Sequence, residues 1–207
     1  NQDIILPMNT DIRENSIAKI NVNSKLLKIL NTIPIADSVD IFYPEQELLF
    51  CQGRIYDLRL GRHDIGYHKN WVDSYLKSSF HFEWFQSENS DNPSERMITY
   101  ARSIPYFSSP EKHKAVIAIS INEKKLKETL QEMKLSEDGT MLIIDRQGGI
   151  VSSNRIDPFI FTSEESPWIS LITNATEEQL LSYTINGRPH IISAVNSELS
   201  PLIYVSI

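Results

Sequence analysis

Aromatic and arginine side chains recur at spacings that could build the walls of a ligand pocket. Tyr67, Trp71 and Tyr75 lie four residues apart in a segment whose pattern predicts a helix, so their rings share one face. Tyr100 and Arg102 alternate along an expected strand and also share a face. Aromatic rings stack on sugars, and an arginine fork grips a carboxylate or neighbouring hydroxyl groups. The alternative for an aromatic stripe at helical spacing is ordinary core packing.

Other reactive side chains form no recognisable catalytic or metal motif. His63 and His68 flank Asp64, but they are five residues apart in an expected loop, whereas helical metal sites favour histidines at i and i+4. We expect a solvated, charged lid there, and no metal. Gly61-x4-Gly66 lacks the Lys-Ser/Thr of a phosphate loop, and the chain has neither a Gly-x-Ser-x-Gly elbow nor an HExxH motif. The sequence therefore gives no motif that would predict an enzymatic activity or a bound cofactor.

Composition narrows the classes of partner. The 207 residues carry a formal net charge of −7, whereas a duplex-binding surface needs clustered Lys and Arg, so we expect no nucleic acid as a partner of this segment. A hydrophobic fraction of 41% is enough for a packed core. The single cysteine, Cys51, excludes an intrachain disulfide and a CxxC metal site. We predict that it is a small buried hydrophobe on a strand.

The periodicity of apolar residues predicts the elements of the first half. A stripe at 3–4 spacing indicates a long N-terminal helix, with a break where Asn23-Ser24 restarts it and an end at Pro34. The elements expected after it are a hairpin of strands 38–43 and 48–51, a loop over 53–66, a helix over 67–78, and strands over 80–85, 97–106 and 114–121.

The second half repeats this pattern in shorter form. A helix opens at Asn122, and Asn186-Gly187 between two apolar runs is a strong hairpin signal. Thr176-x-x-Gln179 fits a capping box and predicts a short helix. The expected elements are a hairpin of strands 139–145 and 150–153, short helices over 168–172 and 176–181, and strands over 181–185, 189–196 and 202–207.

This order predicts an α+β fold, with two antiparallel sheets of five strands beside one helical spine. We divide the chain into a spine helix, a first module, a linking helix and a second module, over residues 1–33, 34–121, 122–136 and 137–207. No apolar stretch approaches the length of a membrane span. Because the chain begins within a pattern and stops on an apolar strand, we expect a piece of a longer protein.

Three stretches carry a resemblance to a known family. They are residues 138–153 (DGTMLIIDRQGGIVSS); Trp71 and Trp84 with the strands that follow; and the ending 202–207 (LIYVSI). Together they resemble the double Cache (dCache) family of extracytoplasmic bacterial sensors, whose two modules look like PAS domains. Within this family, the sequence pattern is most similar to that of the sensor domains of Gram-positive sugar-responsive histidine kinases and of membrane-anchored AraC-type regulators.

The resemblance implies an extracellular ligand-sensing domain on the outer side of the cell membrane, without catalytic activity. Membrane helices would flank it in the full-length protein, and a homodimer is left open. The ligand would lie in the membrane-distal module, here 34–121. Its walls would be Tyr67, Trp71, Tyr75, Tyr100 and Arg102, closed by Trp84 and His81.

A sugar is the ligand we favour, with a carboxylate or an amine next. Amino-acid-sensing members carry Tyr-x4-Arg-x-Trp-Tyr on this helix, and alignment on Trp71 places Asp64, Lys69 and Val72 at the other three positions. Two alternatives stay open: a solute-capturing protein or enzyme without signalling, and a sensor that a partner protein drives while its pocket is empty. The second module has a short connecting segment that leaves little room for a ligand cavity, so we expect it to transmit the signal and not to bind the ligand.

Overall fold

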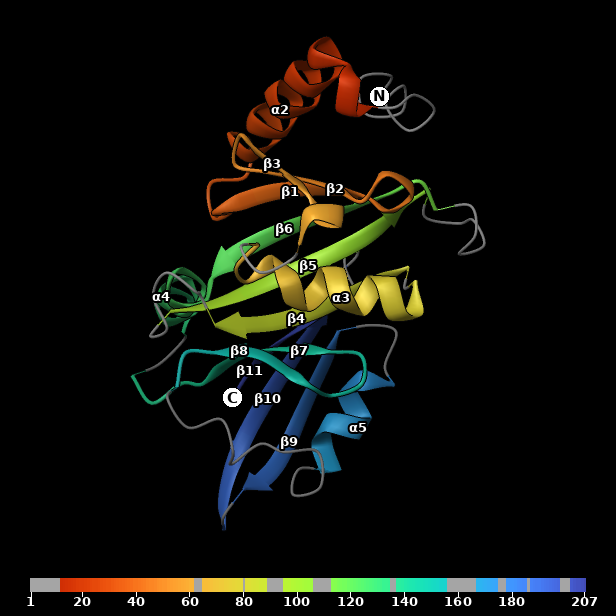
Figure 1. Ribbon diagram of the computed structural model, residues 1–207. Helices are drawn as coiled ribbons and strands as arrows, with labels where there is room; N and C mark the ends of the chain where they lie inside the picture. Colours follow the sequence, from red (N-terminus) through yellow and green to blue (C-terminus); the bar gives the residue numbers. More distant parts are fainter. Residues whose placement is uncertain are drawn as a thin grey trace. The chain divides into compact units, whose positions relative to one another are not determined.

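The computed structural model describes residues 12–61, 65–79, 81–88, 95–105, 113–134, 137–155, 167–174, 178–185, 187–197 and 202–207. The chain divides into two compact units, Asn1–Glu123 and Lys124–Ile207. Each unit has its own antiparallel sheet with helices (Figure 1), so the predicted α+β fold class with two antiparallel sheets is confirmed. Within the residues described, no helix is long and apolar enough to cross a membrane.

Within the described residues, the N-terminal helix is continuous from Ser16 to Leu30. A 3-10 turn, η2 (Ile12–Glu14), precedes α2 (Ser16–Leu30), and the Asn15 side chain caps α2 by accepting a hydrogen bond from the Ala18 amide. The predicted break at Asn23-Ser24 is wrong, because α2 continues through it. Buried side chains on either side of that position, Val22 and Leu26, belong to the core of the first unit, and tertiary packing of this kind outweighs local propensity.

The first unit contains one strand more than the five predicted. Its sheet has the order β3-β2-β1-β6-β5-β4, with every neighbouring pair antiparallel. The strands are β1 (Ser38–Tyr43), β2 (Leu48–Cys51), β3 (Arg54–Asp57), β4 (Phe82–Glu88), β5 (Arg96–Ile104) and β6 (Ala115–Asn122).

Strand β3 lies in the segment predicted to be a loop, and the 3-10 turn η4 (Leu58–Leu60) follows it. The charged residues of β3 gave no strand signal in the sequence. An edge strand pairs on one side only, so it can keep polar side chains in water. The tight turn from β2 into β3 uses Gly53, at a φ of 79°.

The two faces of this sheet carry separate cores. Helix α2 packs against β1 and β2 on one face, in a cluster that includes Val39, Ile41 and Ile104. Helix α3 (His68–Ser78) covers the other face, in a cluster that includes Phe42, Trp71, Tyr75 and Ala101. Alternation along each strand therefore decides which helix a side chain meets.

The second unit has the five-stranded antiparallel sheet that was predicted, in the order β8-β7-β11-β10-β9. Its elements are α4 (Glu123–Met133), β7 (Met141–Asp145), β8 (Ile150–Ser153), α5 (Pro167–Thr173), β9 (Gln179–Ile185), β10 (Arg188–Asn196) and β11 (Leu202–Ser206). The predicted short helix over 176–181 is wrong where it is described, because Gln179 pairs with Ala194 and begins β9. Thr176 lies outside the described residues.

Candidate functional site

Helix α3 carries two of the three aromatic residues of the predicted helical stripe. It ends at Ser79, which has a left-handed φ of 46°, and packs through Trp71 and Tyr75, which are 0% and 3% exposed. Both rings meet Phe42 of β1 edge-on, at centroid distances of 6.4 and 6.2 Å. These two residues therefore take the core packing that was the alternative to a pocket wall.

Tyr67, the residue before α3, has a different environment. Its ring is partly buried, and its hydroxyl lies 2.9 Å from the hydroxyl of Ser38 on β1. Burial raises the pKa of the Tyr67 phenol, so it is protonated at neutral pH and can donate a hydrogen bond. Of the three aromatic residues of the stripe, it is the one that reaches both the sheet and a surface groove.

The remaining predicted wall residues lie on the opposite face of the sheet from α3. Ala101 belongs to the α3-side cluster and Ile104 to the α2-side cluster, so Tyr100 and Arg102 point away from α3. Trp84 pairs with Tyr100 across β4 and β5, with ring centroids 4.8 Å apart.

The predicted single cavity enclosed by both sets of residues is therefore wrong. A period of two places alternate residues on opposite faces, and the sequence does not say which face the helix covers. His81, expected to help close the pocket, is exposed, and its ring lies 4.9 Å from that of His113. His63 and Asp64 of the predicted lid lie outside the described residues.

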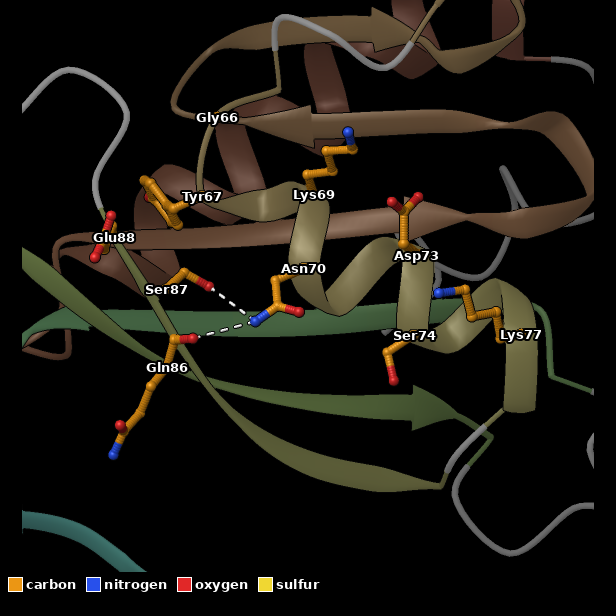
Figure 2. Close-up of a pocket in the computed structure, with 10 residues that line it drawn as sticks. All are labelled: Gly66, Tyr67, Lys69, Asn70, Asp73, Ser74, Lys77, Gln86, Ser87 and Glu88. Atoms are coloured by element: carbon orange, nitrogen blue, oxygen red, sulfur yellow. Dashed lines mark hydrogen bonds between the residues drawn. The ribbon is translucent and has the colours of Figure 1, made fainter. Parts of the chain in front are cut away.

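An open groove of about 710 Å³ runs between α3 and the edge strand β4 (Figure 2). Asn70 joins its two walls, because its side-chain amide donates to the Gln86 carbonyl at 3.1 Å and to the Ser87 hydroxyl at 3.3 Å. The lining residues are mostly polar, and Tyr67 is the only aromatic among them. They are Gly66, Tyr67, Lys69, Asn70, Asp73, Ser74, Lys77, Gln86, Ser87 and Glu88.

This lining offers hydrogen-bond donors and acceptors of every kind. Lys69 and Lys77 supply cations, and Asp73 and Glu88 supply carboxylates, so the formal charges balance. The amides and hydroxyl groups add neutral donors and acceptors. A groove of this size and polarity suits a small solute with several hydrogen-bonding groups better than an apolar one.

Beneath Tyr67, the α3-facing side of the sheet carries buried polar side chains. Ser38 and Asp40 on β1 are both 0% exposed, and the Ser38 hydroxyl donates to Asp40 Oδ2 at 3.0 Å. His68, the first residue of α3, places Nδ1 3.2 Å from the same carboxylate oxygen. Thr99 and Ser120 share a further hydrogen bond at 2.9 Å.

Cys51 completes this group from β2. It is buried on a strand, as predicted. Burial, and then the nearby Asp40 carboxylate, raise the pKa of the Cys51 thiol to about 12, and the Arg54 charge offsets this only in part. The thiol is therefore protonated at neutral pH in the chain by itself.

Asp40 was not among the site residues predicted from the sequence. It stands in an apolar run, and its carboxylate is the sole charged group of β1. A charge in a strand that is otherwise apolar is the signal that could have identified it, because buried carboxylates are rare without a partner.

Among known proteins, this chain is similar only in structure to those that match it. No family model matches the chain, and neither does any curated protein. Solved structures do match. The sensory domain of the Campylobacter jejuni chemoreceptor Tlp3, with isoleucine bound, is 14% identical with a TM-score of 0.53, over 99% of this chain and 80% of that one.

The extracellular domain mmHK1S-Z3, assigned to a histidine kinase, is 11% identical with a TM-score of 0.58, over 99% of this chain and 85% of that one. A second such domain, rpHK1S-Z16, is 12% identical with a TM-score of 0.56, over 99% and 82%. The chain has the fold of Cache-type sensory domains. The resemblance seen in the sequence is thereby confirmed at the level of the fold.

Proposed function

We propose that the chain is the extracellular ligand-sensing domain of a bacterial transmembrane receptor, and that a small solute binds in the groove between α3 and β4. The likeness to sensory domains over 99% of the chain is the observation that carries this proposal. The receptor would have flanking membrane helices and a cytoplasmic output domain, such as a histidine kinase or an AraC-type regulator. The proposed role of this segment is to bind a ligand, and not to catalyse a reaction.

The favoured ligand is a neutral, hydroxyl-rich solute such as a sugar. Both signs of charge line the groove in equal number, with amides and hydroxyl groups between them, and Tyr67 supplies a ring for stacking. A simple carboxylate is less favoured than the sequence suggested, because Arg102 faces the other side of the sheet. A carboxylate would depend instead on Lys69 and Lys77.

An amino acid is the second candidate, because solved structures of the Tlp3 domain contain isoleucine and L-valine. Lysine and carboxylate side chains in one groove could pair with both charges of a zwitterion. Against it, Lys69 and Val72 replace residues of the family's amino-acid motif, and Val72 is completely buried.

Signalling requires a ligand that binds one state of the receptor better than the other. A solute in the groove would touch both α3 and β4, whose separation the Asn70 hydrogen bonds now set. Binding would therefore favour one position of α3 on the sheet. We propose that this displacement is passed on to the second unit, which acts as the transmitter.

A thermal-shift screen of sugars, carboxylates and amino acids against the 207-residue chain tests the proposal. A solute at 100 times its Kd stabilises the folded state by about 2.7 kcal/mol, which raises the Tm by several degrees. We expect at least one sugar to do so. A chain that none of the three classes stabilises would contradict solute sensing and favour a receptor driven by a partner protein.

A further inference from the structure

Three buried side chains in the first unit converge beneath the start of α3. Asp40 comes from β1, Cys51 from β2 and His68 from α3, and they are 0%, 4% and 7% exposed. A carboxylate oxygen, the thiol sulfur and an imidazole nitrogen all lie within 4.8 Å of one another. We propose that these three residues bind one Zn²⁺ ion, which the sequence analysis did not predict.

The donor set fits zinc in both chemistry and size. Thiolate, imidazole and carboxylate are the three ligand types that zinc takes in proteins. At bond lengths of about 2.0 to 2.3 Å, the ligand atoms of a tetrahedral site are about 3.3 to 3.8 Å apart. The distance of 3.2 Å between His68 Nδ1 and Asp40 Oδ2 is about 0.1 Å below this range, and no other pair of ligand atoms has to close by more than about 1 Å to reach it.

Two polar atoms at this point lack the hydrogen bonds that buried atoms require. Within the described residues, Asp40 Oδ1 and His68 Nδ1 have no hydrogen-bond partner, although both side chains are more than nine-tenths buried. A plain ion pair between the two residues would leave Oδ1 unsatisfied, at a cost of several kcal/mol for a buried charge. Binding of a divalent cation would release the Cys51 thiol proton to solvent, and the cation would then balance the two negative charges of the carboxylate and the thiolate beside the neutral imidazole.

Neighbouring groups already hold the carboxylate in place. The Ser38 hydroxyl donates to Asp40 Oδ2, and the Tyr67 hydroxyl lies 2.9 Å from that of Ser38. Such outer hydrogen bonds orient metal ligands and tune affinity. Three protein ligands leave one position of a tetrahedral zinc open to water or another small ligand. The inference does not depend on which solute the groove binds.

The residues of this site are not the set that the sequence suggested as possible metal ligands. His68 was paired there with His63, its near neighbour in the chain. In the structure its partners are Asp40 and Cys51, which reach it from two adjacent strands that are distant from it in sequence. A site built in this way leaves no short sequence motif by which it could be predicted.

Titration of the chelator-treated 207-residue chain with Co²⁺, a spectroscopic substitute for Zn²⁺, tests the proposal. Cys51 is the sole cysteine, so a thiolate-to-cobalt charge-transfer band can arise from this residue alone. We expect a band that saturates at one equivalent of Co²⁺ and disappears when Zn²⁺ is added. A chain that shows no such band would overturn the proposal.

Variants assign the ligands. Cys51→Ser should abolish the band, and Asp40→Asn and His68→Asn should each weaken Co²⁺ affinity by at least about 100-fold, more than the 10- to 100-fold typical of outer-shell residues. His190→Asn and Asp138→Asn change the same residue types elsewhere in the chain and should leave Co²⁺ affinity unchanged. Equal weakening by the controls, or full affinity in Asp40→Asn and His68→Asn, would overturn the assignment.

A measurement on the unaltered chain covers the case in which a buried variant fails to fold. Zn²⁺ bound to the Cys51 sulfur should slow alkylation of the folded chain at least about tenfold relative to the chelator-treated chain. Magnesium, which prefers oxygen ligands, should give no protection. Equal alkylation rates with and without Zn²⁺ would overturn the proposal.

Discussion

The Tyr67 hydroxyl lies 2.9 Å from the Ser38 hydroxyl, so a residue that lines the surface groove also touches the buried polar group of the sheet. Ser38 in turn donates to Asp40. A solute that moves the Tyr67 ring would therefore disturb hydrogen bonds at the centre of the first unit. This chain of contacts is a physical route from the groove into the sheet.

Removing this hydroxyl tests the route. Tyr67→Phe keeps the ring but loses one hydrogen bond, so we expect the free energy of unfolding to fall by about 1 kcal/mol. Ser38 keeps its bond to Asp40, which limits the cost. Urea unfolding measures the change, and Tyr204→Phe, on the partly exposed ring of β11, is the matched control. Equal stability of the two variants would show that the Tyr67–Ser38 contact contributes nothing.

Trp71 gives a second prediction, which separates core packing from ligand stacking. Its side chain is 0% exposed, so Trp71→Ala should lower the free energy of unfolding by about 3 to 5 kcal/mol through the cavity it leaves. Trp84→Ala removes a ring that is only partly buried and should cost less. Denaturant unfolding compares the two. A stable Trp71→Ala variant that no longer binds solute would restore this tryptophan as a pocket wall.

Alkaline pH should destabilise the first unit through its buried tyrosines. Burial raises the pKa of Tyr75 to about 12, from an ordinary value of 10.0. Between these values the unfolded chain loses a proton that the folded chain keeps, so stability is complete below pH 10 and falls as pH rises towards 12. The slope for this residue is about −1.4 kcal/mol per pH unit. Burial also raises the pKa of Tyr43, which steepens the fall.

The contribution of Tyr75 can be isolated by replacing it with phenylalanine. Tyr75→Phe should flatten the dependence of unfolding free energy on pH between 10 and 12, measured by urea unfolding at a series of pH values. Tyr204→Phe, with a partly exposed ring, should leave the slope as it is. Identical slopes in Tyr75→Phe and the unaltered chain would show that Tyr75 ionises at its ordinary pKa in the folded state.

Most of the fold was predictable because its elements have strong periodic signals. The apolar runs over β1, β2 and β6 and the Asn-Gly pair in the sequence between β9 and β10 predicted two antiparallel sheets. The errors fall where tertiary pairing decides the structure. Gln179 begins a strand because Ala194 lies opposite it, and Arg54 to Asp57 form a strand because β2 offers a free edge.

The site was predictable only in part. Helical spacing correctly placed Trp71 and Tyr75 on one face, and strand alternation did the same for Tyr100 and Arg102. What spacing could not supply is which face of the sheet meets α3, because that depends on the packing of the whole unit. Asp40 and Cys51 reach His68 through pairing between strands, which leaves no local pattern.

Calorimetric titration of the solute found in the screen tests the central claim, which is that the groove between α3 and β4 binds the signal. Asp73→Ala and Asn70→Ala change groove residues and should each weaken affinity at least about tenfold, or about 1.4 kcal/mol. Arg102→Ala changes the opposite face of the sheet and should leave affinity unchanged. Weaker binding in Arg102→Ala, with full affinity in both groove variants, would contradict the account.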